Sequence, residues 1–390
     1  MYNDAVIVGV LCETVEGEKR VALIPESAKL LVGKGFEVLI EKSAGEGAGF
    51  SDELYSLAGA KIVKDAQEVC GQASIILKVL GPTDGHKHSE VAHLKSGTSI
   101  ISFLFPATNL DSVKALADKG VTTFAMDLIP RITRAQSMDA LSSMSTIAGY
   151  RGALLAATHL PKFLPMFMTA AGTLPPAKAF VIGAGVAGLQ AIATCKRLGA
   201  IVFAFDVRPA VKEQVESLGA RFVDMPHAIE DLEDKGGYAK EVSGDTHAKE
   251  LEVISKQVAK CDIVITTALI PGRPAPVLIT KEMVKLMAPG SVIVDLAATN
   301  GGNCEETKPG HICVAHGVTI IGTTSMLSDM AADASKMYSR NITQFLLNLA
   351  PEGTLKLDLE DEIIRDTIVT HEGKVTHSPT QLLMQKGGAS

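Results

Sequence analysis

A glycine-rich turn offers the clearest chemistry in the sequence. Gly183, Gly185 and Gly188 form the pattern G-x-G-x-x-G, directly after a strand-like run at 179–182 and at the start of a helix-like run. The first glycine permits a tight turn, the second lets the backbone approach a pyrophosphate, and the third lets helix and strand pack closely. The free N–H groups at the helix start favour phosphate. The pattern therefore predicts a dinucleotide-binding turn.

An acidic residue follows at the spacing that such a site requires. The next strand-like run, Ile201–Phe205, leads into Asp206, about 20 residues beyond the turn. A carboxylate there accepts hydrogen bonds from ribose hydroxyls and repels a 2′-phosphate, which favours NAD over NADP. Arg208 is the opposing feature, because NADP sites use a nearby arginine. The alternative, a glycine turn with an incidental surface aspartate, is disfavoured by the combined spacing.

A second polar cluster lies where the first part of the chain passes into a long helix-like stretch. Its members are Arg131, Arg134, Gln136, Asp139 and Ser142. Two arginines, an amide, a carboxylate and a hydroxyl at a domain junction could line a cleft that faces a nicotinamide ring. The alternative is a capped helix start, with Ser137 or Thr133 as the N-cap and the arginines in solvent. Composition alone favours that alternative.

The elements that would position these residues alternate between strand-like and helix-like runs. The first series occupies 5–11, 25–34, 36–41, 52–57, 75–79, 99–103, 110–119 and 122–125. Such alternation predicts βαβ units and a mostly parallel sheet. Lys78 stands at the end of one apolar run, either as a substrate-binding amine or as a strand-end lysine that reaches solvent. We favour the second interpretation.

A second series of the same kind begins at 177. Its runs occupy 179–182, 188–198, 201–205, 209–217, 221–223, 262–266, 281–287, 292–295 and 319–321. Because single cores stop growing near roughly 250–300 residues, a chain of 390 residues splits into two domains. The sequence thus predicts an α/β fold of two doubly wound, Rossmann-like domains with mostly parallel sheets, joined by long helices.

The expected domain boundaries follow from the two series. The first domain comprises 1–135 and 330–390, and the second, 136–329, is entered by a bridging helix at 137–159. An apolar helix running from Asp333 to Leu349 is expected to return to the first domain, with a polar tail after it. A charge-dense stretch at 231–249 breaks the rule of short connections and is either a functional lid or a disordered insertion.

Composition excludes several classes of protein. A formal net charge of −7 without a Lys/Arg block argues against nucleic acid as a partner. The six cysteines form no C-x-x-C pair, so we expect neither a disulfide framework nor a metal site. No segment matches a secretory signal or a membrane helix, since the longest uncharged stretches are broken by glycine or proline. We therefore expect a protein of the reduced cytosol.

Longer motifs resemble a known family. They are 131–139 (RITRAQSMD), 168–178 (MTAAGTLPPAK), 181–190 (VIGAGVAGLQ), 206–209 (DVRP), 267–276 (TALIPGRPAP), 295–297 (DLA) and 301–304 (GGNC). Together they closely resemble the NAD(H)-binding component of NAD(P) transhydrogenases, over almost the whole chain. The start of the chain, RVALIP at 20–25, is shared with alanine dehydrogenases of the same superfamily.

The resemblance implies a proton-translocating, Re/Si-specific transhydrogenase in which hydride passes from NADH on this chain to NADP⁺ on a partner. Proximity and orientation then replace side-chain acid–base chemistry. It implies that Gln136 holds the nicotinamide while Arg131, Asp139 and Ser142 arrange it. The remaining cofactor contacts that it implies are Gly183, Gly185, Val186, Gly188, Asp206, Val207, Arg208, Gly237, Tyr238, Ala268 and Leu269. Tyr238 matches the family's mobile loop, which favours the lid interpretation of 231–249.

The same resemblance implies partners. Since the sequence ends at Ser390 without membrane helices, we expect a separately encoded subunit, a homodimer in the cytoplasm that docks on the inner membrane through NADP(H)-binding and membrane-spanning subunits. One departure concerns Thr299 and Asn300, which stand where relatives commonly carry a glutamate, so no role of that acid is carried over.

Two rival functions remain. An alanine dehydrogenase needs a positioned acid or base, yet Phe105, Pro106 and Ala107 follow the strand after which those enzymes carry a histidine. Lys78 alone is retained. An NAD-sensing module would bind the cofactor without hydride transfer, and the cluster at 131–139 argues mildly against it.

Overall fold

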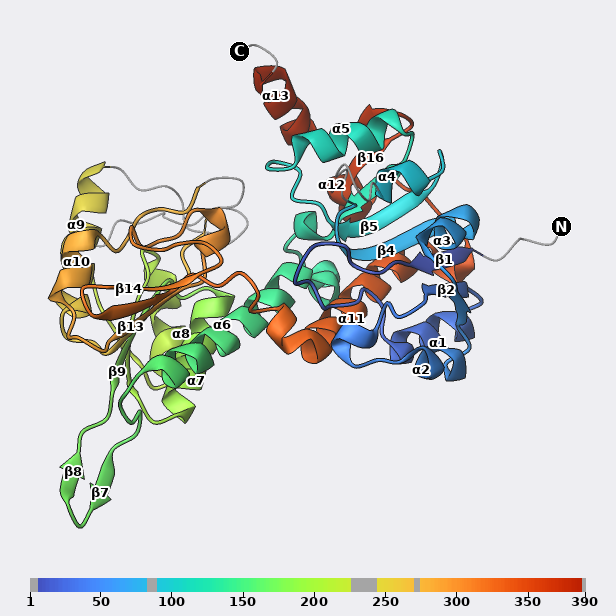
Figure 1. Ribbon diagram of the computed structural model, residues 1–390. Helices are drawn as coiled ribbons and strands as arrows, with labels where there is room; N and C mark the ends of the chain where they lie inside the picture. Colours follow the sequence, from blue (N-terminus) through green and yellow to red (C-terminus); the bar gives the residue numbers. More distant parts are fainter. Residues whose placement is uncertain (1–5, 83–89, 226–243, 270–273, 388–390) are drawn as a thin grey trace. The chain divides into compact units, whose positions relative to one another are not determined.

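The computed structural model describes residues 6–82, 90–225, 244–269 and 274–387. The chain divides into two compact units, Met1–Met144 with Ser328–Ser390, and Ser145–Leu327. Each unit contains a large sheet with helices on both faces (Figure 1). Most neighbouring strands are parallel, so the predicted α/β class with mostly parallel sheets is confirmed.

The sheet of the first unit has the strand order β17-β16-β6-β5-β4-β1-β2-β3. Its strands are β1 (Ile7–Val10), β2 (Glu37–Glu41), β3 (Lys61–Val63), β4 (Ile75–Leu80), β5 (Ser99–Phe103), β6 (Thr122–Ala125), β16 (Ile368–His371) and β17 (Lys374–Val375). β16 pairs antiparallel with both β6 and β17, and the other strand pairs of this sheet among the described residues are parallel. The central strands are buried apolar runs, which suits a parallel sheet covered on both faces.

Helices cover both faces of this sheet. They are α1 (Pro25–Gly33), α2 (Asp52–Leu57), α3 (Ala66–Gln72), α4 (Glu90–His93), α5 (Leu110–Asp118), α11 (Ala331–Leu349), α12 (Glu362–Thr367) and α13 (Ser378–Gly387). Apolar residues of α3, α4 and α5 share one core cluster with the strands. On α11, the Tyr338 ring packs against Phe103 at 5.1 Å between centroids, and Phe345 packs against Phe124 at 5.7 Å. Helix α11 is therefore part of the core of the first unit.

The predicted polar tail after α11 is wrong. The chain there returns to the sheet, since β16 pairs with β6 and its residues Ile368 and Val369 are buried. The hydroxyls of Thr123 and Thr370 lie 2.9 Å apart within this pairing. A strand this short, surrounded by polar residues, is stabilised by its distant partner rather than by its own periodicity.

The sheet of the second unit has the order β11-β10-β9-β12-β13-β15-β14, parallel except for β14. Its strands are β9 (Lys178–Ile182), β10 (Ile201–Phe205), β11 (Arg221–Phe222), β12 (Ile263–Thr266), β13 (Val292–Asp295), β14 (Ile312–Ala315) and β15 (Val318–Ile321). The helices are α6 (Ala140–His159), α7 (Val186–Arg197), α8 (Lys212–Ser217), α9 (Gly244–Val258) and α10 (Lys281–Leu286). Helices α6, α7 and α8 pack on one face and α9 and α10 on the other.

The start of α6 differs from the prediction. Residues Thr133–Met138 form a 3-10 helix, η3, and α6 begins at Ala140 rather than at Ser137. The Asp139 carboxylate accepts a hydrogen bond from the Ser142 backbone N–H at 2.9 Å. This is the bond of an N-cap, so Asp139 caps the helix, and neither Ser137 nor Thr133 does.

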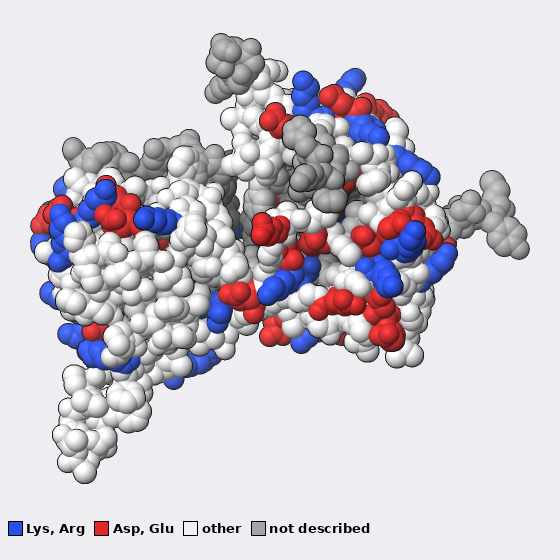
Figure 2. All heavy atoms as spheres, viewed as in Figure 1, with Lys and Arg blue, Asp and Glu red and all other residues white. Residues whose placement is uncertain are grey.

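Two further segments of the second unit differ from the expected pattern. Of the charge-dense stretch at 231–249, residues 231–243 lie outside the described part of the chain, and residues 244–249 begin helix α9. A separate two-stranded hairpin, β7 (Phe167–Thr169) with β8 (Gly172–Leu174), has every residue exposed. Figure 2 shows this hairpin, at the lower left, free of Lys, Arg, Asp and Glu on the face in view.

Candidate functional site

The order of the second sheet reverses beside its first strand. β9 pairs with β10 on one side and with β12 on the other. The connections that follow β9 and β12 therefore leave the sheet in opposite directions. In doubly wound sheets ligands bind outside the carboxyl ends of the strands at such a switch point. Gly183 follows β9 there, and Thr267 follows β12. The glycine pattern therefore lies at the edge where a dinucleotide is expected.

The three glycines of the pattern face different surroundings. A Cβ on Gly183, whose φ is +93°, would lie 2.5 Å from the Thr267 Oγ1, and one on Gly188 would lie 1.9 Å from the Gly183 carbonyl oxygen. Both positions need glycine for close packing of the protein itself. Among the described residues, a Cβ on Gly185 would meet only the Arg208 Nη2 at 4.0 Å. The described residues thus leave the space in front of Gly185 open, as approach of a pyrophosphate to the start of α7 requires.

Asp206 is tied to the turn and to its own neighbour. Its Oδ2 accepts hydrogen bonds from the Ala184 N–H at 2.7 Å and the Arg208 Nη2 at 2.8 Å. Its Oδ1 accepts from the Arg208 N–H at 2.8 Å and Nε at 2.9 Å. A carboxylate offers about four acceptor positions, so these bonds fill it. Recognition of ribose hydroxyls by Asp206 thus requires the Arg208 guanidinium to give up at least one bond.

The other predicted cofactor contacts fall into three groups. Val186, the first residue of α7, and Leu269, after β12, are 39% exposed. Val207 packs against the core cluster beneath α9 and α10, as does Ala268. Gly237 and Tyr238 lie outside the described residues.

Helix α9 brings a carboxyl group that sequence reasoning missed. Glu250 is 5% exposed, and its Oε2 lies 3.1 Å from the His247 Nδ1. Burial raises the pKa of Glu250, and the negative charge of Asp206 raises it further, whereas the contact with His247 lowers it. The one signal of Glu250 in the sequence is a position on the apolar face of an amphipathic helix within a charged stretch.

The second predicted cluster lies in the first unit, around η3. Gln136 is exposed on η3, while its neighbours Ala135 and Met138 are buried and anchor the turn. The Asp139 Oδ2 accepts a bond from the Ser142 hydroxyl at 2.5 Å, beside the backbone bond that caps α6. Asp139 and Ser142 are thus held together, with Gln136 displayed one turn before them. Arg131 is exposed.

Arg134 is exposed, as the alternative of solvated arginines expected, but it is also ion-paired. Its Nη1 lies 3.0 Å and its Nη2 2.5 Å from the two carboxylate oxygens of Asp361, which precedes α12. The hydrogen bond from Arg134 is the main cause that lowers the pKa of Asp361 to about 2. This pair fixes η3 to the C-terminal part of the same unit.

The prediction that Lys78 is a strand-end lysine that reaches solvent is wrong. Its side chain is 1% exposed, within β4, and its Nζ contacts the Glu90 carboxylate and lies 3.7 Å from that of Glu13. Glu13 also accepts bonds from the backbone N–H groups of Val79 and Leu80 at 2.7 and 3.2 Å. The ammonium is buried because two carboxylates from distant segments compensate its charge.

Glu13 is expected to make stability depend on pH. Burial outweighs the attraction of Lys78 and raises the pKa of Glu13 to about 7. The folded chain then holds this proton more tightly than the unfolded chain, so stability falls as the pH rises from the ordinary value of 4.5 towards 7. The loss is on the order of 3 kcal/mol. Glu13→Gln should flatten the pH dependence of the thermal unfolding midpoint between pH 5 and pH 8.

Glu37→Gln is the matched control, because Glu37 is an exposed carboxyl group on the neighbouring strand β2. It should leave the wild-type pH dependence intact. Equal slopes for Glu13→Gln and the wild type would show that Glu13 is ionised throughout this range.

The described part of the chain holds no group of three or more His, Cys, Asp or Glu side chains placed to bind a metal ion. Among the same residues, no helix combines the length and apolar character needed to cross a bilayer.

The fold, the switch point and the glycine turn define a nucleotide-binding α/β protein of the Rossmann class. Comparison with known proteins then gives the family. Residues 9–148 match the family described as "Alanine dehydrogenase/PNT, N-terminal domain", and residues 152–378 match "Alanine dehydrogenase/PNT, C-terminal domain". The chain belongs to this family, and within it to the alpha subunits of NAD(P) transhydrogenases. The resemblance seen in the sequence is thereby confirmed.

Individual relatives agree with this assignment. The chain is 50% identical over 365 residues to an NAD(P) transhydrogenase alpha subunit of Rhodospirillum rubrum, covering 93% of this chain and 95% of the relative. A solved transhydrogenase structure from Sinorhizobium meliloti matches with a TM-score of 0.85 and 46% identity, covering 95% of this chain and 99% of that one. The alanine dehydrogenase of Halomonas elongata is 32% identical over 368 residues, 92% of each chain. These matches support an oxidoreductase role.

Proposed function

We propose that this chain is the NAD(H)-binding subunit of a proton-translocating, Re/Si-specific NAD(P) transhydrogenase. The open space before Gly185, with Asp206 bonded to the same turn, is the observation that carries the proposal. NADH, when bound, supplies the hydride, and an NADP⁺-binding partner receives it. The chain itself contributes binding and orientation, which need no acid or base.

We propose the following roles, from positions within the second unit for the turn residues and from the family resemblance for the cluster at 131–142. The N–H groups at the start of α7, from Val186 onward, face the pyrophosphate, and Asp206 to Arg208 contact the adenosine side. Ala268 and Leu269 border the site from the end of β12. Gln136 holds the nicotinamide, and Arg131, Asp139 and Ser142 arrange it. We retain Gly237 and Tyr238 as contacts proposed from the family resemblance.

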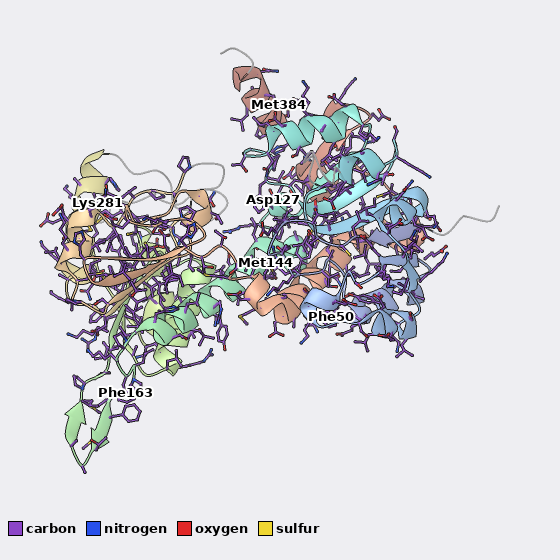
Figure 3. All side chains as sticks on the ribbon, in the orientation of Figure 1. Phe50, Asp127, Met144, Phe163, Lys281 and Met384 are labelled. Atoms are coloured by element: carbon purple, nitrogen blue, oxygen red, sulfur yellow. The ribbon has the colours of Figure 1, made fainter. Side chains whose placement is uncertain are left out.

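We also propose that the hairpin β7–β8 supports a homodimer. The exposed apolar residues of the hairpin and of the segment that leads into it are Phe163 (56%), Met166 (58%), Phe167 (40%), Met168 (79%) and Leu174 (45%). The sequence carries no charged residue between Lys162 and Lys178, and the Phe163 ring, labelled in Figure 3, lies 4.6 Å from that of Phe167. An isolated two-stranded hairpin is at best marginally stable in water, and apolar patches of this kind mark interfaces. A twofold dimer would bury it.

Met168→Glu should convert the dimer into monomers. A charge at the most exposed apolar position of the hairpin cannot be buried without a partner ion, so the association constant should fall at least 100-fold. Sedimentation or light scattering across a concentration series measures this. Leu57→Glu, at an 83% exposed leucine of α2, is the matched control and should remain dimeric. A dimeric Met168→Glu would place the interface elsewhere.

The alanine dehydrogenase alternative is disfavoured by the first unit. Phe105 follows β5 where that chemistry needs a histidine, and the Asp127 carboxylate, labelled in Figure 3, accepts the Leu104 and Phe105 N–H groups at 2.7 and 3.0 Å. Lys78, the amine that such an enzyme would offer to a substrate, is compensated by Glu13 and Glu90. An NAD-sensing module is the second alternative, and it predicts binding without transfer.

Names of the relatives support the proposed partners. Several are called transhydrogenase subunits, which points to further subunits beside this one. We propose that NADP(H)-binding and membrane-spanning subunits complete the enzyme and that this chain docks on them at the cytoplasmic side of the inner membrane. We propose no nucleic-acid partner, given the net charge of −7.

The deciding experiment measures hydride transfer from NADH to an NADP⁺ analogue by the purified full chain, with and without the NADP-binding domain of a related transhydrogenase. Alanine with NAD⁺ is assayed in parallel. Transfer that requires the added domain supports the proposal. Reduction of NAD⁺ by alanine without a partner would establish an alanine dehydrogenase, and NADH binding with no transfer would favour a sensor.

A further inference from the structure

A buried asparagine links three segments at the carboxyl edge of the second sheet. Asn303 is 0% exposed, and its Nδ2 donates hydrogen bonds to the carbonyl oxygens of Ala268 at 2.9 Å and Pro276 at 2.8 Å. The backbone carbonyl oxygen of Asn303 accepts hydrogen bonds from the N–H groups of Leu278 and Ile279 at 2.8 and 2.9 Å. Backbone and side chain of one residue thus hold both the segment that leaves β12 and the one that leads to α10.

Asp295 fixes Asn303 in place. This carboxylate, at the end of β13, is 0% exposed, and its Oδ2 accepts the N–H groups of Asn303 and Cys304 at 2.8 and 3.1 Å. The same oxygen accepts the Thr307 hydroxyl at 2.7 Å, while Oδ1 accepts the Thr266 hydroxyl at 3.0 Å. The loop after β13 is therefore bonded to the ends of both β12 and β13.

The orientation of the Asn303 amide is determined by its surroundings. Both Nδ2 hydrogens face carbonyl acceptors, whereas Oδ1 is buried and has no hydrogen-bond partner within the described residues. A flipped amide would set an oxygen against two oxygens. A buried acceptor without a donor costs about 1–3 kcal/mol, and the two hydrogen bonds that Nδ2 donates offset this cost. The amide is kept for the two bonds that it donates.

Those two bonds bear on the glycine turn. Ala268 directly follows Thr267, whose hydroxyl lies 3.1 Å from the Gly183 carbonyl oxygen and so donates to the turn. A Cβ on Gly183 would lie 3.4 Å from the Ala268 N. The β12 end and the turn are in direct contact, so a shift of Ala268 displaces one wall of the proposed site.

We propose that Asn303 is a positioning residue of the dinucleotide site, which holds Ala268 against the glycine turn without touching the cofactor. The inference rests on the proposed NAD(H) site. In Asn303→Asp a carboxylate would face the Ala268 and Pro276 carbonyl oxygens, and both donors would be lost. We expect the dissociation constant for NADH to rise at least tenfold at pH 8.

The pH dependence of NADH binding by Asn303→Asp separates a positioning role from a merely structural one. At pH 6 a larger share of the introduced carboxyl group is protonated and regains one donor, so the ratio of variant to wild-type dissociation constants should fall. Thr267→Val, which removes the bond to the glycine turn and keeps the side-chain shape, should weaken NADH binding about three- to tenfold. It also decides the matter if Asn303→Asp does not fold, because unchanged binding by Thr267→Val would overturn the inference.

Thr370→Val is the matched control. It removes buried hydroxyl bonds to Val121 and Thr123 in the first unit, so it should lower the thermal midpoint and leave NADH affinity within twofold. Wild-type affinity in a folded Asn303→Asp would overturn the positioning role. A wild-type chain that binds no NADH would instead overturn the proposed function, which distinguishes the two failures.

Discussion

Gly185→Ala is expected to weaken NADH binding at least 100-fold while the chain stays folded. The backbone at Gly185, with φ −75° and ψ −168°, is open to alanine, and the new methyl would meet no atom of the described residues closer than the Arg208 Nη2 at 4.0 Å. It would occupy the space through which a pyrophosphate must approach to within about 3 Å of the N–H groups of α7. Titration of NADH fluorescence, with the thermal midpoint measured alongside, tests this expectation.

The neighbouring glycines cannot serve this purpose. Alanine at Gly183 or Gly188 would clash with the protein itself, so a loss of binding there would not separate a blocked site from a damaged fold. Gly71→Ala is the matched control, because a methyl on this residue of α3 meets no atom within 4 Å. It should change neither affinity nor folding. Wild-type affinity in Gly185→Ala would mean that the dinucleotide does not cross this turn.

The glycine turn was predictable because its determinants are local. An apolar run, a tight turn and a helix start follow one another within about 20 residues, and each has its own sequence signal. The structure places β9, the turn and α7 in that order. The same holds for β5 and β13, whose bounds agree with the predicted runs, since buried parallel strands are continuous apolar segments.

Elements that depend on distant partners were missed. The strand β16 forms only because β6 lies beside it, and the hairpin β7–β8 exposes apolar residues, which the usual pattern of buried apolar faces does not anticipate. The prediction for Lys78 was wrong for the same reason. A lysine in an apolar run suggests a strand end, unless the carboxylates that compensate it, Glu13 and Glu90, are known to converge on it.

The site shows the same division. The sequence identifies Asp206, but not that Arg208 fills its acceptor positions. It contains Asn303 within a family motif, but not its bonds to Ala268 and Pro276, which depend on the loops after β12 and β13 meeting. Spacing along the chain identifies which residues can bind a phosphate or a ribose. Which of them position the others is decided by long-range contacts.

Gln136 is the residue on which the proposed hydride transfer depends most directly. Two contacts hold the 3-10 helix η3: Asn341 Nδ2 donates to the Ser137 carbonyl oxygen at 2.8 Å, and Arg134 pairs with Asp361. Gln136 is exposed on this turn. Its backbone is held in place, so the length of the side chain decides how far the amide group extends from the turn. A side chain in this position can orient a nicotinamide without bearing much of the binding energy.

Gln136→Asn should therefore lower the rate of hydride transfer about 100-fold and change the dissociation constant for NADH less than threefold. The substitution keeps the amide and withdraws it by about 1.5 Å, and a misplacement of about 1 Å can cost 10²-fold in rate. Single-turnover transfer to an NADP⁺ analogue on the partner domain, with NADH affinity measured separately, tests the split. Thr133→Ser, on the same turn, should leave both unchanged. If binding collapses and the rate per bound NADH stays at the wild-type value, Gln136 anchors the cofactor rather than orienting it.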